Sequence, residues 1–152
     1  MAVRTYLVIV DESAEARAAL RYASRRAASV GGAVQLLSIA PQQDFVAFGG
    51  VQATIEEEAR DRAEVLAMSA AGSLFTESGK MPGIAVKMGK GTEVVREYLS
   101  EHPEVTMLVL GAAREGGPGP LVSHFSAGSG TLPCPVMIVP GGLSDEEIDQ
   151  LS

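Results

Sequence analysis

The chain has 152 residues, a length that suits one domain with a sizeable hydrophobic core. The hydrophobic content of 46% excludes an intrinsically disordered chain, and no apolar run is long enough to span a membrane. The net charge of −7 argues against a nucleic-acid-binding surface, and the single cysteine excludes an intrachain disulfide. The N-terminus lacks a basic segment followed by a long apolar stretch, so the expected location is the cytoplasm.

The first third of the chain alternates apolar runs with a helical pattern. A near-continuous apolar run predicts a buried strand at residues 4–10, and Ser13 is a plausible N-cap for a helix over 14–30. A second apolar strand is expected at 33–40. The segment 41–53 follows without helix or strand periodicity, and its phenylalanines predict either a mobile flap or partner-contact loop, or a loop tucked over the next helix.

The rest of the chain continues this alternation. The expected elements are a helix at 54–74, a strand at 84–88, a helix from about 92, a strand at 106–110, a helix at 120–130 and a strand at 135–139. Strands separated by helices imply a parallel sheet, so the predicted fold class is a three-layer α/β open sheet with helices on both faces. The domain covers 1–140, and 141–152 is a short acidic tail of the same domain with an N-cap signature at Ser144.

The most informative segment connects the fourth and fifth strands. An apolar run ends at Gly111, and a glycine-rich loop at 112–120 leads into a helix. Glycines let a backbone approach a ligand, and N–H groups at such a loop can point at phosphate oxygens. Open sheets of this class bind ligands at the carboxyl ends of their strands, where the strand order reverses. Asp11 follows the first strand, so Asp11 and Gly111 meet there if the first and fourth strands are neighbours.

Five segments carry a resemblance to a known family. They are Asp11-Glu12-Ser13, Leu36-Leu37-Ser38-Ile39, Met88-Gly89, Met107-Leu108-Val109-Leu110-Gly111, and Pro133-Cys134-Pro135-Val136-Met137-Ile138-Val139. In this order and spacing the chain resembles the universal stress protein family over nearly its whole length. The resemblance implies five parallel strands in the order 3-2-1-4-5. It also implies binding of ATP or AMP, as in many members, and dimers through the fifth strand.

The family's nucleotide-binding motif is Gly-x2-Gly-x9-Gly-[Ser/Thr], and this chain departs from it. Gly111 matches the first glycine, and Arg114 stands at the second. Counted literally, the motif ends at His124-Phe125. Anchored on Pro133-Cys134-Pro135, with a loop two residues shorter, it ends at Val122-Ser123, the alignment that keeps the helix intact and retains a hydroxyl.

Other residues of the loop could compensate for the missing glycines. Gly116, Gly117 and Gly119 offer flexible backbone, and the Ser123 hydroxyl offers a hydrogen bond to phosphate. Arg114 could hold a phosphate as an auxiliary cation, and equally it could plug the site.

The first strand supplies the best single candidate for ligand contact. The resemblance implies that the Asp11 carboxylate accepts hydrogen bonds from a ribose or an adenine edge. The alternative is a helix-start residue that bonds local N–H groups. Ile9, Val10 and Ile39 would form the apolar wall against the base, a role compatible with their being core residues.

Three interpretations of function follow. The first is a regulatory module that binds ATP or AMP at the crevice between the first and fourth strands, with slow hydrolysis at most, because no general base is evident. The second is a nucleotide-free, degenerate member that acts as a dimeric interaction module for an unidentified protein partner. The third, supported only by Arg114, is an enzyme acting on another small phosphorylated or acidic ligand. No metal ligation is expected, since His102 and His124 lack ligand spacing with each other or with Cys134.

The fifth strand predicts a homodimer. In the expected order this strand is an edge, and its residues Pro135, Val136, Met137, Ile138 and Val139 carry no charge to discourage pairing. The resemblance implies antiparallel pairing of two copies about a two-fold axis. Leu143, Ile148 and Leu151 of the tail either cover this edge, which would leave a monomer, or reach across to the other subunit.

Overall fold

The computed structural model describes residues 3–41 and 49–152. Five parallel strands form one sheet in the order β3-β2-β1-β4-β5, which confirms the predicted topology. The strands are β1 (Thr5–Val10), β2 (Ala33–Ala40), β3 (Gly83–Met88), β4 (Val105–Ala112) and β5 (Val136–Pro140). The helices are α1 (Ala14–Val30), α2 (Gly49–Ser78), α3 (Gly91–Glu101), α4 (Pro120–Ala127), a 3-10 turn η1 (Ser129–Thr131) and α5 (Asp145–Leu151).

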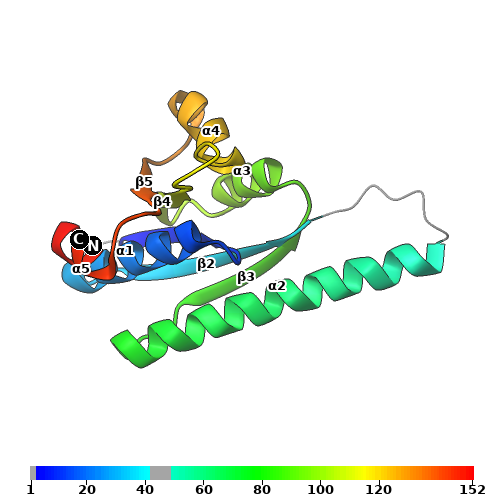
Figure 1. The fold of residues 1–152 in the computed structure, drawn as a ribbon, viewed down its shortest axis with the longest axis horizontal. Helices are drawn as coiled ribbons and strands as arrows, with labels where there is room; N and C mark the ends of the chain where they lie inside the picture. The colour runs from blue at the N-terminus through cyan, green and yellow to red at the C-terminus, as the bar shows by residue number, and fades with distance from the viewer. Residues whose placement is uncertain (1–2, 42–48) are drawn as a thin grey trace.

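Helices cover both faces of the sheet because successive strand residues point to opposite faces. In β1, Tyr6, Val8 and Val10 belong to the hydrophobic cluster shared with α1, α2 and α5. Leu7 and Ile9 point the other way, into the cluster shared with α3 and α4. Figure 1 shows α3 and α4 on one side of the sheet and α2 on the other.

Local signals set the ends of α1 as predicted. The Ser13 hydroxyl accepts a hydrogen bond from the Ala16 N–H at 3.1 Å, which satisfies one of the open donors of the first turn. Gly31 has a φ of 68°, and its N–H donates to the Ala27 carbonyl. A left-handed residue of this kind ends a helix most cheaply when it is glycine.

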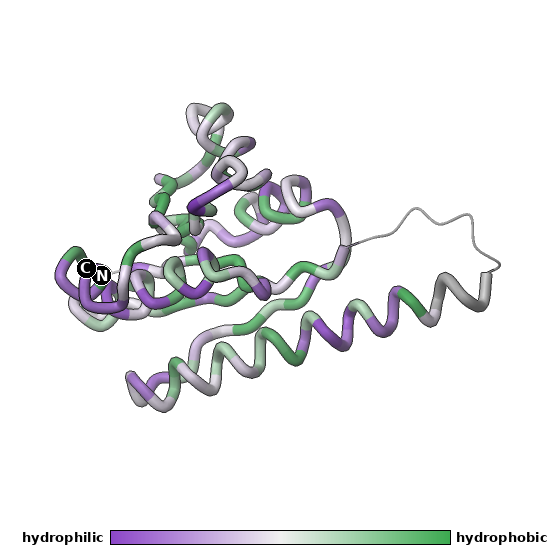
Figure 2. The backbone as a smooth tube through the Cα atoms, viewed as in Figure 1, coloured by the Kyte–Doolittle hydropathy of each residue, from purple (hydrophilic) through white to green (hydrophobic). Residues whose placement is uncertain are grey.

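Helix α2 is longer than the prediction of 54–74 at both ends. It begins at Gly49, so the prediction of irregular structure is wrong for residues 49–53, and the rest of that segment, 42–48, lies outside the described residues. Its C-terminus passes Leu74 and stops at Gly79, which has a φ of 74° and donates its N–H to the Phe75 carbonyl. The sequence pattern ends early because Phe75 is exposed, and periodicity registers only buried positions. Figure 2 shows alternating hydrophilic and hydrophobic stretches along this helix.

Strands β4 and β5 each extend beyond the predicted limits. Gly111 and Ala112 continue β4 and pair with Val139 and Pro140 of β5, so Gly111 lies inside a strand and does not begin the loop. Pro140 ends β5 without disturbing the sheet, because β5 is an edge strand and needs no N–H on its open side.

The acidic tail forms helix α5, which packs on α1. Ser144 and Glu147 make the reciprocal bonds of a capping box, as the sequence signature predicts. Ile148 is buried in the cluster on the α1 face of the sheet, whereas Leu151 is exposed. The guanidinium of Arg21 donates two hydrogen bonds of 2.8 Å to Asp149. Ile148 therefore serves the α1 face, a role that the sequence pattern did not indicate.

Candidate functional site

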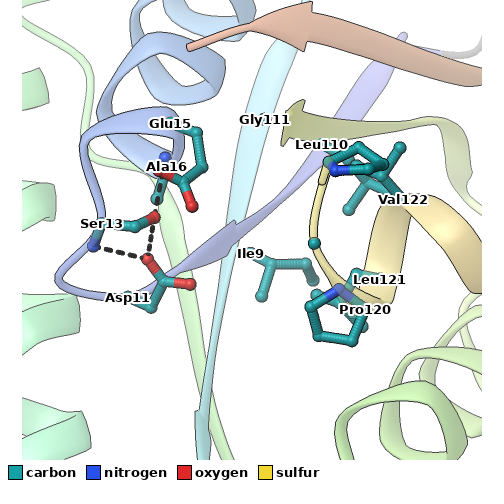
Figure 3. Close-up of a pocket in the computed structure, with 12 residues that line it drawn as sticks. Ile9, Asp11, Ser13, Glu15, Ala16, Leu110, Gly111, Pro120, Leu121 and Val122 are labelled. Carbon is teal, nitrogen blue, oxygen red and sulfur yellow. Dashed lines mark hydrogen bonds between the residues drawn. The ribbon is translucent and has the colours of Figure 1, made fainter. Parts of the chain in front are cut away.

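A small crevice lies at the carboxyl ends of β1 and β4, the predicted place. Its volume is about 90 Å³, and it lies between the first turn of α1 and the loop that leads into α4 (Figure 3). The lining residues are Ile9, Asp11, Ser13, Glu15, Ala16, Leu110, Gly111, Pro118, Gly119, Pro120, Leu121 and Val122. The strand order places these segments together, since β1 and β4 are neighbours at the point where the order reverses.

Asp11 makes the local hydrogen bonds that one of its two predicted roles, that of a helix-start residue, requires. Its Oδ1 accepts hydrogen bonds from the Ser13 N–H at 2.7 Å and from the Ser13 hydroxyl. Among the described residues its Oδ2 has no hydrogen-bond partner, and Figure 3 shows this oxygen pointing toward the side of the crevice where Ile9 lies. The local turn thus orients the carboxylate and leaves one oxygen available to a ligand.

The loop between β4 and α4 offers backbone donors at the opposite wall. Gly116, Gly117 and Gly119 all adopt positive φ, between 76° and 102°, conformations that favour glycine. The Ala113 N–H donates to Pro118 at 3.1 Å, and the Ser123 N–H donates to Gly119 at 3.0 Å.

Two prolines limit how many donors the loop residues of the crevice retain. Pro118 and Pro120 line the crevice and have no N–H. Among the described lining residues on the α4 side, Gly119, Leu121 and Val122 therefore keep an N–H. These are the donors at the open N-terminus of α4.

Two glycines allow α1 to begin directly against the sheet. A Cβ at Gly111 would overlap the carbonyl oxygen of Glu15. A Cβ at Gly141, just after β5, would lie 2.8 Å from the Glu15 Cβ and 2.7 Å from the Ala112 oxygen. The missing side chains thus let the first turn of α1 rest on the ends of β4 and β5, and this contact fixes the backbone of Glu15 at the crevice wall.

The structure brings four of the predicted site residues together and places six elsewhere. Those lining the crevice are Ile9, Asp11, Gly111 and Gly119. Those outside its lining are Val10, Ile39, Arg114, Gly116, Gly117 and Ser123.

Physical reasons account for these positions. Val10 points to the α1 face of the sheet, because it alternates with Ile9. Ile39 lies on the same face as Ile9 but belongs to β2. The side chain of Arg114 lies against Gly142, where a Cβ would be 3.2 Å from the arginine Cδ. Ser123 is exposed on α4, one residue beyond Val122.

The crevice is acidic. Asp11 and Glu15 line it, and the part of the chain that the structure describes contributes no lysine, arginine or histidine to its lining. Within residues 3–41 and 54–152, neither carboxylate has an ion-pair partner. The sequence interpretation missed Glu15, although its place in the first turn of the helix that follows the site strand was an available signal.

Arg96 of α3 holds α4 and η1 in place behind the crevice. Its Nε donates to His124 Nε2 at 3.2 Å, a terminal nitrogen donates to the Thr131 hydroxyl at 3.4 Å, and its guanidinium carbon lies 5.5 Å from the centre of the Phe125 ring. Phe125 is fully buried. His124 is therefore engaged with α3, and among the described residues no cluster of three or more histidine, cysteine or acidic side chains could hold a metal.

A larger groove of about 620 Å³ lies on the other face of the sheet, between α1, α2 and α5. Val10 and Glu12 line it, and Asp11 lines both this groove and the crevice. Arg17 and Arg21 contribute positive charge, although Arg21 is paired with Asp149. This groove contains no other predicted site residue. None of the helices that the structure describes is long and apolar enough to cross a membrane.

Comparisons with known proteins show which solved structures have a similar fold. No curated protein sequence matches the chain. Among the solved structures that resemble it is the universal stress protein UspA from Lactobacillus plantarum, with a TM-score of 0.76, 17% sequence identity, and coverage of 91% of this chain and 99% of that one.

Two further structures contain nucleotides. The universal stress protein from Archaeoglobus fulgidus in complex with dAMP has a TM-score of 0.64 at 17% identity, covering 91% of this chain and 99% of that one. A universal stress protein family protein from Arabidopsis thaliana with AMP bound has a TM-score of 0.64 at 17% identity and covers 94% of each chain. A family model, the Universal stress protein family, matches residues 2–140. The chain therefore belongs to the universal stress protein family.

Proposed function

We propose that this chain is a regulatory module that binds an adenine nucleotide at the crevice between β1 and β4. The observation that carries the proposal is the Asp11 Oδ2, which has no hydrogen-bond partner among the described residues. It faces the N-terminus of α4 across an apolar floor formed by Ile9. A carboxylate oxygen can accept from ribose hydroxyls or an adenine amine, and the N–H groups of the helix terminus can receive a phosphate.

The size of the crevice defines how such a ligand would bind. A volume of about 90 Å³ is well below the roughly 300 Å³ at which pockets for small organic ligands begin. The crevice therefore takes the phosphate end, and the base extends along the carboxyl ends of β1 and β2. Ile39 lies on the same face of the sheet as Ile9 and would contact the base there. The complexes of related proteins with dAMP and AMP support an adenine ligand for this fold.

Calorimetric titration with AMP, ATP and GMP tests the proposal. We expect saturable binding of AMP in preference to GMP. Asp11→Ala should weaken it by about 1.5–3 kcal/mol, the range for a hydrogen bond to a charged group. Asp61→Ala, at an exposed residue of α2 outside the crevice lining, removes the same charge and serves as the control. The absence of any heat or melting shift with all three nucleotides would reject the proposal.

The second candidate function is a nucleotide-free interaction module. It is favoured by the small crevice, whose described lining residues include two carboxylates and no cationic side chain. In this case the β5 edge would be the functional surface. Unchanged melting temperature with every nucleotide, combined with a stable dimer, would be the expected result.

Under either function the chain forms a homodimer through β5. Among the described strands, β5 pairs with β4 alone, so no described strand pairs with the other side of its backbone. Ile138 at its centre is 38% exposed, a large fraction for an isoleucine in a strand. Antiparallel pairing of two β5 strands about a two-fold axis would satisfy the open backbone groups and bury Ile138 of both copies.

A further inference from the structure

We infer that the crevice selects adenine ligands with a single phosphate over ATP, and that Glu15 is a specificity-determining residue. The inference rests on the proposed function. It names the ligand class of that site, and it has three independent supports: the charge of the crevice, the number of its donors and the fixed position of Glu15.

Charge is the first support. Asp11 and Glu15 line the crevice without a compensating cation or an ion-pair partner among the described residues. ATP carries two more phosphate groups than AMP, and each brings further negative charge toward these carboxylates. Repulsion between like charges is a common way for a site to reject the wrong ligand.

The neighbouring cations do not relieve this repulsion. Arg114 lies against Gly142, Arg17 lines the groove on the opposite face of the sheet, and Lys90 precedes α3 outside the lining. The segment 42–53 contains no lysine, arginine or histidine, so it has no cation to contribute.

The donor count is the second support. On the α4 side of the crevice, the lining residues Gly119, Leu121 and Val122 have an N–H group, whereas the lining residues Pro118 and Pro120 have none. Three donors suit the oxygens of one phosphate. A triphosphate would leave most of its charged oxygens without donors in a volume of about 90 Å³.

The position of Glu15 is the third support. Its backbone packs against Gly111 and Gly141, so the first turn of α1 cannot shift away from the crevice without opening the contact with β4 and β5. The backbone and Cβ of Glu15 are therefore fixed beside the crevice, so its carboxylate stays within side-chain reach of a ligand there.

The experiment compares AMP, ADP and ATP by calorimetry, for the intact chain and two variants. Salt is held at about 0.15 M, where charges farther than about 8 Å are largely screened. We expect the intact chain to bind AMP about tenfold or more tightly than ATP. Glu15→Gln should reduce this ratio of affinities by about threefold or more. Glu12→Gln is the matched control, since Glu12 lines the other groove and not the crevice. It should leave the ratio unchanged.

A second measurement needs no variant. If repulsion between the carboxylates and the phosphates causes the preference for AMP, raising the salt concentration should reduce the ratio of AMP affinity to ATP affinity in the unaltered chain. ATP binding as tightly as AMP, with or without magnesium, would overturn the inference while leaving the proposed function intact. An ATP-to-AMP ratio that neither Glu15→Gln nor salt changes would also overturn it. Absence of binding by all three nucleotides would instead reject the proposed function, and the inference with it.

Discussion

Gly111 in β4 packs directly against the backbone of Glu15 in α1. The carbonyl group of Glu15 occupies the space where a side chain at position 111 would be. The two residues are distant in sequence, and their contact joins the sheet to the wall of the crevice. Gly111 matches the first glycine of the family's nucleotide-binding motif, which predicts a ligand-binding role for it. In this chain it also has a packing role that any substitution would disturb.

Gly111→Ala should destabilise the protein. Its Cβ would overlap the Glu15 carbonyl oxygen, which belongs to backbone and cannot rotate away. Overpacking of this kind costs about 1–3 kcal/mol, and a urea titration would measure it as a lower unfolding midpoint. Gly72→Ala is the matched control, because a Cβ there meets nothing within 4 Å. In the interior of helix α2 it should stabilise by about 0.5–1 kcal/mol. Equal stability of the two variants would contradict the packing role.

The contact between α5 and α1 should weaken in acid, because it includes the ion pair of Arg21 with Asp149. The hydrogen bonds from Arg21 hold the pKa of the Asp149 carboxyl below its usual value. A depressed folded-state pKa means that this stabilisation is complete above the ordinary carboxyl range and disappears as the pH falls through the lowered pKa. Asp149→Asn should therefore lower the melting temperature at neutral pH and make no difference in strong acid.

Asp145→Asn is the control for that measurement. Asp145 makes only a 3.7 Å contact with Arg21, and its side chain is 67% exposed. At neutral pH, Asp145→Asn should lower the melting temperature less than Asp149→Asn does. If the melting temperatures of Asp149→Asn and the unaltered chain still differ in strong acid, the charge of Asp149 is not the cause of the difference.

Ser123→Ala should weaken AMP binding by about 1 kcal/mol, the scale of one neutral hydrogen bond. Ser123 follows Val122 on α4, so a phosphate at the helix terminus that extends past the crevice would contact its hydroxyl. Ser126→Ala, on the next turn of the same helix, should have no effect. Equal affinity of both variants would confine the phosphate to the crevice and remove Ser123 from the site.

Ile138→Lys should convert the proposed homodimer into a monomer. The lysine would place a charge at the centre of the β5 edge, where the two copies would meet. Sedimentation at micromolar concentration should then give a species of 15.8 kDa, the mass of one chain. Val65→Lys, at a residue of α2 that is 67% exposed, should leave the larger species unchanged. A 15.8 kDa species for the unaltered chain would refute the dimer.

The sequence by itself determined the α/β class and most element positions, because these depend on local physical terms. Apolar runs such as β2 indicate burial on both faces. Ser13 and Gly31 limit α1 by side-chain capping and a left-handed turn, and Ser144 begins α5 through its capping box. With the family resemblance, the sequence also predicted the strand order and the end of the sheet where Asp11 and Gly111 meet.

Only the tertiary structure decided which residues share the crevice. Val10 points away from it because side chains alternate across a strand, and Arg114 lies over Gly142 because the β5 to α5 connection passes there. Glu15 reaches the crevice wall only because two glycines, from β4 and from the end of β5, leave room for α1. The contacts of Arg114 and of Glu15 join segments that are distant in sequence. They follow from close packing in three dimensions, which the local sequence pattern does not specify.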